Sequence, residues 1–304
     1  MDLSSAKAWY VLARCVDYFG LTLFAGGLFF LAVLWPAGGN ERRARAVVVT
    51  GWCLGLAGTL AGIGLEGAWA AQRPAADFLD WDLIGQVLTV DFGRIWFAKA
   101  LLWLLGGVVL AGLLQRGRAA ATSAGWRVGA GVVVLGLLRT TGLTGHSVES
   151  THPLLTQLAD LGHLAGICTW IGGLAMLLFG VLARREPGVL AAVVPRYSKL
   201  AMVSVLVVIV AGVVLAGQTV GSVGRVFTTG YGQILLVKLA LLAVVLLIAQ
   251  GSKSWVARRL DFAVVLRGDA ATVRPFVYSV AAETVLVIVV LLAASFLVTA
   301  SPGR

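Results

Sequence analysis

The chain has 304 residues, of which 59% are hydrophobic and 12% charged, and its mean hydropathy is +0.94. A soluble domain carries about 25% charged residues, so a soluble globular protein is excluded. The formal net charge is +10, but no basic stripe is interleaved with exposed aromatic residues. We therefore exclude nucleic-acid binding and interpret the basic residues as loop charges that orient a membrane protein.

Eight apolar stretches are long enough to cross a bilayer core of roughly 30 Å. The first follows "MDLSSAK", is too long for the apolar region of a signal peptide and has no convincing cleavage site after it, so we expect it to be a retained span. The sequence predicts an all-α polytopic protein with eight transmembrane helices at 9–35, 46–70, 92–114, 126–145, 158–182, 198–220, 231–250 and 277–299.

Basic residues fall on alternate loops of this arrangement. The loops that follow spans one, three, five and seven are rich in arginine and lysine, whereas the opposite loops carry mainly Asp and Glu. Cytoplasmic loops of membrane proteins are enriched in Lys and Arg. We therefore predict that the loops after the odd-numbered spans are cytoplasmic and that both termini are extracytoplasmic.

The two halves of the chain resemble each other. Span one reads "LARCVDYFGLTLFAGGL" and span five "LADLGHLAGICTWIGGL", so that Asp17 aligns with His163. Span three carries "TVDFGRIWFAKALL" and span seven "TTGYGQILLVKLAL", which end near Lys99 and Lys238. Four spans separate the copies, which predicts a parallel duplication of the kind known in transporters. The expected repeats are residues 1–145 and 146–304, together forming one membrane domain.

Ionisable and polar residues cluster toward the outer ends of the predicted spans. Such residues are costly against lipid and are expected to face the bundle interior or water. These residues predict a polar cavity open to the outside. Alternatively, they pair with one another and hold helices together, with the two lysines neutralising nearby carboxylates. The outer set is Arg14, Asp17, Glu66, Lys99, Arg139, Asp160, His163, Gln218 and Lys238, whereas Glu283 lies toward the inner side.

All three histidines lie in one stretch, "LTGHSVESTHPLLTQLADLGHLAG". Asp160 and His163 are spaced i, i+3 on one helix, and a carboxylate there could orient the imidazole or join it as a ligand. Imidazole with carboxylate suits Cu(II) or Zn(II). We predict a metal site at which His146 and His163 converge, with Asp17 or Asp160 adjacent and His152 as a more mobile entry ligand. The alternative is that the histidines are structural.

The remaining patterns favour structure over chemistry. Residues 62–67 fit GxGxxG but lie inside a predicted span with no preceding strand, so they do not indicate a dinucleotide site. The three cysteines form no CxxC pair and are expected to be small core residues. No hydrolase pattern stands out, and we expect the protein not to be an enzyme. The spacing of Gly51, Gly55, Gly58 and Gly62 predicts a helix-packing surface.

The second half resembles the copper resistance protein D (CopD) family. The resemblance rests on "TGHS" at 144–147, "ADLGHLAGICTWIGGL" at 159–174, "YSKLAM" at 197–202, "TTGYGQILLVKL" at 228–239 and the C-terminal "LVTASPG". It implies an inner-membrane copper-handling protein that moves copper inward, often alongside a periplasmic CopC-like copper carrier. His146 and His163 match the family's motif histidines, and Asp160 accompanies the second motif. The chain has only three methionines, which puts a methionine-lined Cu(I) path in doubt.

Three functions are therefore compared. The first is a copper-binding membrane transporter or resistance protein. The second is a membrane electron-transfer protein that binds haem b, which needs two axial histidines facing each other within the bundle. The third is an assembly or scaffold protein whose polar cluster is purely structural.

Overall fold

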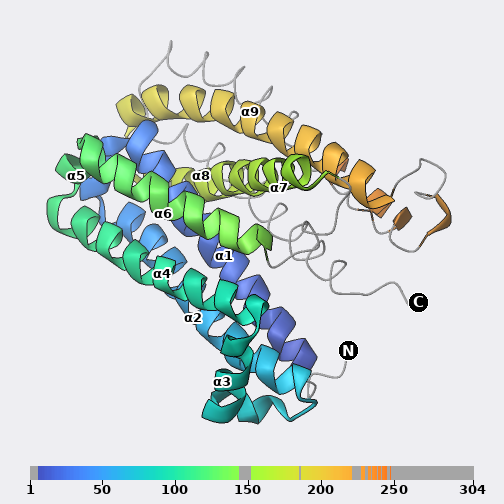
Figure 1. Cartoon of the computed structure of the whole chain (residues 1–304). Helices are drawn as coiled ribbons and strands as arrows, with labels where there is room; N and C mark the ends of the chain where they lie inside the picture. Colours follow the sequence, from blue (N-terminus) through green and yellow to red (C-terminus); the bar gives the residue numbers. More distant parts are fainter. Residues whose placement is uncertain are drawn as a thin grey trace.

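The computed structural model describes residues 6–143, 152–184 and 186–220, together with separate positions between 227 and 247. Every regular element in these residues is helical (Figure 1). The elements are α1 (Ala6–Val33), η1 (Pro36–Asn40), α2 (Arg42–Ala70), η2 (Ala75–Leu79), α3 (Trp81–Thr89), α4 (Asp91–Arg116), α5 (Arg118–Thr122), α6 (Ala124–Leu143), α7 (Pro153–Ile167), η4 (Cys168–Gly172), α8 (Gly173–Ala175), η5 (Met176–Val181), η6 (Leu182–Arg184) and α9 (Pro187–Val220).

Five helices of the described part are long and apolar enough to cross a membrane: Ala6–Val33, Arg42–Ala70, Gly93–Arg116, Pro153–Arg184 and Gly188–Gln218. They correspond to predicted spans one, two, three, five and six. The helix α6 lies where span four was expected, but Arg127 and Arg139 lower its mean hydropathy, and it is not among the five. Span 277–299 lies outside the described residues, and span 231–250 is described only at separate positions.

Two helices begin well before the predicted spans. Helix α2 begins at Arg42 and α9 at Pro187, where the apolar stretches suggested 46 and 198. Hydropathy marks the part of a helix that lies in hydrocarbon, whereas the helix itself continues into the polar interface. A proline at the first helical position suits the start of α9, because its missing N–H would have no intrahelical partner there.

The connection between α2 and α4 contains structure that the sequence did not predict. It forms η2 and the nine-residue helix α3. The side chain of Asp80 caps α3 by accepting a hydrogen bond from the backbone N–H of Asp82 (2.9 Å). Leu83 and Val87 are buried on one face of α3, so this helix covers the end of the bundle at which α2 ends and α4 begins (Figure 1).

Glycines bring α1 and α2 into backbone contact. A β-carbon on Gly20 would lie 2.2 Å from the amide nitrogen of Gly55, and one on Gly58 would lie 2.5 Å from that of Asp17. Glycines of α2 also make room for the tryptophans of α4, since β-carbons on Gly55 and Gly62 would meet the rings of Trp103 and Trp96. The predicted glycine packing surface of α2 is thus confirmed.

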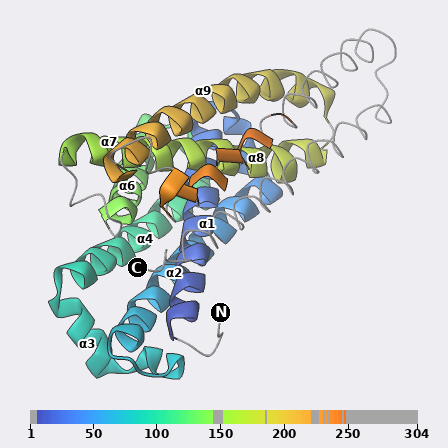
Figure 2. The same ribbon diagram turned by 90° about the vertical axis from the view of Figure 1, so that its right-hand side faces the viewer.

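A second close crossing joins α1 to the span that runs from α7 to η6. A β-carbon on Gly26 would lie 2.1 Å from the carbonyl oxygen of Cys168, and one on Gly172 would lie 2.2 Å from that of Thr22. The Sγ atom of Cys168 donates a long hydrogen bond to the Thr22 hydroxyl (4.0 Å). The two helices cross with their backbones touching, and α9 lies along the other side of α7 (Figures 1 and 2).

We predict that Gly172→Ala destabilises the protein. Its β-carbon would collide with the α1 backbone, which cannot move aside like a flexible side chain, and overpacking of this kind costs about 1–3 kcal/mol or more. The matched control is Gly129→Ala on α6, where a β-carbon would meet nothing within 4 Å. That change should stabilise α6 by up to about 1 kcal/mol through helix propensity. Thermal unfolding in detergent measures both, and equal effects of the two substitutions would contradict the crossing.

Candidate functional site

An ion pair buried between three helices is the centre of the polar cluster. The ammonium of Lys99 on α4 donates to Oδ2 of Asp17 on α1, and the hydroxyl of Thr59 on α2 donates to Oδ1 (2.9 Å). Asp17 and Lys99 are each only 1% exposed, and Thr59 is fully buried. Both carboxylate oxygens therefore have donors, as a buried charge requires.

Aromatic rings enclose the positive end of this pair. The Lys99 ammonium lies 5.4 Å from the ring centre of Trp96 and 5.9 Å from that of Tyr18. A cation within about 6 Å of an aromatic ring is attracted to the negative ring face, and the attraction grows when water is excluded. The rings thus stabilise a charge that the bilayer would otherwise penalise.

The polar cluster continues along α1 away from the ion pair. Arg14 donates to the Tyr18 hydroxyl (3.1 Å), and its guanidinium lies 5.8 Å from the Tyr10 ring. Glu66 on α2 is half-buried, and its Oε2 atom is buried without a hydrogen-bond partner. Arg14, Asp17, Glu66 and Lys99 thus belong to α1, α2 and α4 alone.

A separate polar contact joins α6 to α7. Arg139 donates to Oε1 of Gln157 (2.9 Å). Asp160, one helical turn further along α7, lies against Gly142, since a β-carbon on that glycine would meet its Oδ2 atom. The carboxylate of Asp160 therefore faces α6.

His163 contacts a different helix. Its Nδ1 atom lies 3.1 Å from the backbone carbonyl oxygen of Val208 on α9, and the ring is half-buried against Gly212. Asp160 and His163 are thus neighbours along α7, yet one faces α6 and the other α9. The i, i+3 spacing placed them on adjacent positions of the helix, but the helices packed on either side of α7 determine which group each side chain meets.

The other predicted site residues lie apart from these two. His152 is exposed and immediately precedes Pro153, the first residue of α7. Gln218 is half-buried near the end of α9, while His146, Lys238 and Glu283 lie outside the residues that the structure describes. Within those residues, no three His, Cys, Asp or Glu side chains are grouped so that they could hold a metal ion.

Bis-histidine ligation of haem b, the form considered for this chain, needs two histidines that face each other across the bundle. The two histidines in the described ranges are His152, just before the first residue of α7, and His163 on α7, about 16 Å apart along the helix axis. They cannot serve as opposite axial ligands of one haem.

Sequence reasoning missed Thr59, Tyr10, Tyr18 and Trp96 as members of the cluster. Two of them carried a readable signal, because Tyr10, Arg14 and Tyr18 recur every four residues and so share one face of α1. Thr59 and Trp96 carried none. Their roles depend on how closely α2 approaches α1 and on the rotation of α4.

We predict that Lys99→Met strongly destabilises the protein. Removal of one partner from a buried ion pair leaves an uncompensated charge and costs about 3–5 kcal/mol. The double variant Asp17→Asn with Lys99→Met removes both charges and should recover most of that loss. Unfolding of the single and double variants in detergent gives the coupling energy. Additive losses would show that the two residues do not interact.

Comparison with known proteins places this architecture in a family. The family described as "Copper resistance protein D-like, N-terminal domain" matches residues 4–155, and "Copper resistance protein D" matches residues 191–297. The copper transport protein CutJ of Bacillus subtilis (strain 168) is 27% identical over 256 residues, which cover 77% of this chain. The chain spans 44% of that relative's length. No solved structure matches. The chain belongs to the copper resistance protein D family.

Proposed function

We propose that this protein binds copper at the extracytoplasmic end of its helix bundle and moves it inward across the cytoplasmic membrane. The observation that carries the proposal, beside family membership, is the hydrogen bond of His163. A carbonyl oxygen can only accept, so the contact with Val208 places the proton on Nδ1 and the ring lone pair on Nε2. Histidines that bind metals almost always donate their other N–H in this way.

His163 and His146 are the proposed copper ligands. Asp160 lies one turn from His163 on α7, and the exposed His152 at the start of this helix would be an entry ligand. Asp17 accepts from Lys99 and Thr59, so it could join a metal only by giving up that pair. The polar side chains of α1, α2, α4 and α6, with Gln218 and Lys238, would form the wall of the outward-facing cavity.

We further propose that the protein is a parallel duplication. Two reciprocal contacts support a two-fold relation between α1 and the α7–η6 span. Thr22 aligns with Cys168, and Gly26 with Gly172, when the two segments are superimposed without a gap. Gly26 contacts Cys168, and Gly172 contacts Thr22 in return, which is the reciprocal pattern that a two-fold axis generates.

The neighbouring helices repeat the same relation. Gly20 of α1 packs on Gly51 and Gly55 of α2, and the aligned Gly166 packs on Ser204 and Val208 of α9. Four residues further along α2, Thr59 contacts Asp17. Four residues further along α9, Gly212 contacts His163, which aligns with Asp17. The proposed copper ligand thus occupies the place that the ion-paired carboxylate occupies in the other half.

The direction of transport and the partner are part of this proposal. An extracytoplasmic copper-binding end would receive the ion from a periplasmic carrier of the CopC kind. Both termini outside the cytoplasm follow from the distribution of basic loops. Copper is here the cargo, and the protein acts as a transporter without a catalytic residue.

The topology has a direct test. A single cysteine at position 150 should react with a membrane-impermeant thiol reagent applied to intact cells, because it lies in the predicted outer loop. A single cysteine at position 123, between α5 and α6, should react only after the cells are opened. A variant without native cysteines is the background. The reverse labelling pattern would reject the orientation.

We predict that His163→Ala abolishes copper binding by the purified protein and copper accumulation by cells. Loss of a group that only orients a ligand costs about 10–100-fold in metal affinity, and loss of the ligand itself should cost more. His152→Ala should only reduce both measurements. Titration with copper ions and metal analysis of cells measure these effects.

The same preparations test the other functions. A Soret band in the absorption spectrum of the purified wild type would indicate haem. Unchanged copper binding and accumulation in His163→Ala, with normal stability, would favour a purely structural role for the cluster.

A further inference from the structure

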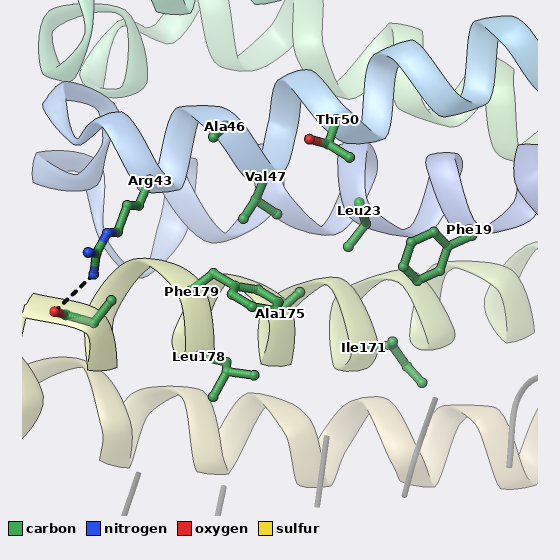
Figure 3. A pocket seen from close by; sticks show the side chains of 11 residues that line it. Phe19, Leu23, Arg43, Ala46, Val47, Thr50, Ile171, Ala175, Leu178 and Phe179 are labelled. Carbon is green, nitrogen blue, oxygen red and sulfur yellow. Dashed lines mark hydrogen bonds between the residues drawn. The ribbon is translucent and has the colours of Figure 1, made fainter. Parts of the chain in front are cut away.

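An apolar groove lies between α2 and the span α7–η6 (Figure 3). Its cavity volume is about 560 Å³. Val47 and Thr50 of α2 form one wall, Ala175 and Phe179 the other, and Phe19 of α1 lies at one end. None of these side chains carries a charge.

The groove is open on the outer surface of the helices. Phe179 is 53% exposed and Phe19 38% exposed, and Thr50 is also exposed. The three helices that form the groove are all long and apolar enough to cross a membrane. In a membrane-spanning helix, large exposed aromatic side chains would face acyl chains, which are the medium around such a helix.

A cationic side chain marks the other end of the groove. Arg43, in the first turn of α2, is exposed and lines the cavity. It donates one hydrogen bond through Nη1 to the carbonyl oxygen of Ala183 (3.2 Å), as Figure 3 shows. A guanidinium has five N–H donors, so this hydrogen bond orients the Arg43 guanidinium and leaves further N–H groups that can donate to a phosphate.

The acidic groups near this end are already paired. Arg184, which follows Ala183, forms ion pairs with Glu41 and with Glu186. Arg42 adds a further positive charge beside Arg43. The mouth of the groove therefore carries net positive charge, which complements an anion.

The length of the groove matches one leaflet. From Ile171 to Ala183 the wall spans thirteen residues, or about 18 Å at the rise of an α-helix. Half of a bilayer core of roughly 30 Å is about 15 Å. An acyl chain that enters beside Arg43 would therefore reach the bilayer midplane near Phe19.

We propose that this groove binds a phospholipid with an anionic headgroup. One acyl chain lies along the groove between α2 and the α7–η6 span, and the headgroup phosphate accepts hydrogen bonds from the Arg43 guanidinium. The bound lipid fills the space between helices of the two halves at the end where the basic loops gather. This site is separate from the histidines and does not depend on copper transport.

The test counts lipids retained by the purified full-length protein in native mass spectrometry. The protein is equilibrated in nanodiscs of phosphatidylcholine that contain a minor fraction of phosphatidylglycerol, and then released. We expect wild type to retain phosphatidylglycerol in preference to phosphatidylcholine. Arg43→Gln should lower that preference about fivefold, the factor that corresponds to the ~1 kcal/mol of one basic residue at an anionic surface. The matched control Arg116→Gln, an exposed arginine in the last turn of α4 at the same end of the bundle and outside the groove, should retain it.

A second pair of variants tests the acyl chain. Ala46 is exposed and lines the groove, so Ala46→Phe should fill the groove and reduce retention of both lipids. Ala57→Phe, on an exposed position of the same helix outside the groove, should not. Both variants are checked for an unchanged melting temperature; if Ala46→Phe fails this check, Ala46→Leu replaces it.

Three results would overturn the proposal. The first is that wild type retains the two lipids equally, or that wild type and Arg43→Gln retain equal amounts of phosphatidylglycerol. The second is effective competition by inorganic phosphate, which would indicate an anion site without a lipid chain. The third is efficient disulfide formation between Phe179→Cys and a cysteine placed in 277–299, which would show that another segment of this chain covers the groove.

Discussion

Close helix approach at glycine is the constraint on which the polar chemistry of this protein depends. The ion pair between Asp17 and Lys99 needs three helices within reach of one carboxylate. Gly58 brings the backbone of α2 against Asp17, and Gly55 and Gly62 make room for the tryptophans of α4. In a bilayer, small residues let helix backbones approach, and every buried charge needs a partner. The glycines let the helix backbones approach each other, and this approach brings Lys99 and Thr59 within reach of the Asp17 carboxylate.

The same principle holds between the halves. Gly26 and Gly172 allow α1 and the α7–η6 span to cross in backbone contact, and η4 and η5 on the second span are π-helical. The π-helix widens the turn by one residue and is frequent near functional sites. Here it lies beside the crossing, one to two turns from His163. The helix that carries the proposed copper ligand is thus irregular at the point where it touches the other half.

The polar chemistry is unequally divided between the halves. In the first, the carboxylate of Asp17 is neutralised by Lys99 and capped by Thr59, so the site is closed and satisfied. In the second, the imidazole of His163 is oriented by a backbone carbonyl of α9. Metal-binding histidines are usually oriented by such a hydrogen bond, as we propose for His163, whereas the paired carboxylate of Asp17 acts as a structural anchor. Under the proposed duplication, a single pattern of helix contacts would provide an anchor in one half and the proposed copper ligand in the other.

The sequence by itself determined the class of the protein and much of its organisation. Apolar length identified the five described helices that are long and apolar enough to cross a membrane. The glycine spacing identified the packing face of α2, and the motifs around His163 indicated the family. Helix starts such as Arg42 and Pro187, and the helix α3, were not visible, because hydropathy responds to the hydrocarbon core and not to the interface. Only the tertiary structure decided the partners: Thr59 and Lys99 for Asp17, α6 for Asp160 and α9 for His163. Spacing along one helix gives the direction in which a side chain leaves it, whereas the group that it meets depends on the rotation and approach of a neighbouring helix far away in the sequence.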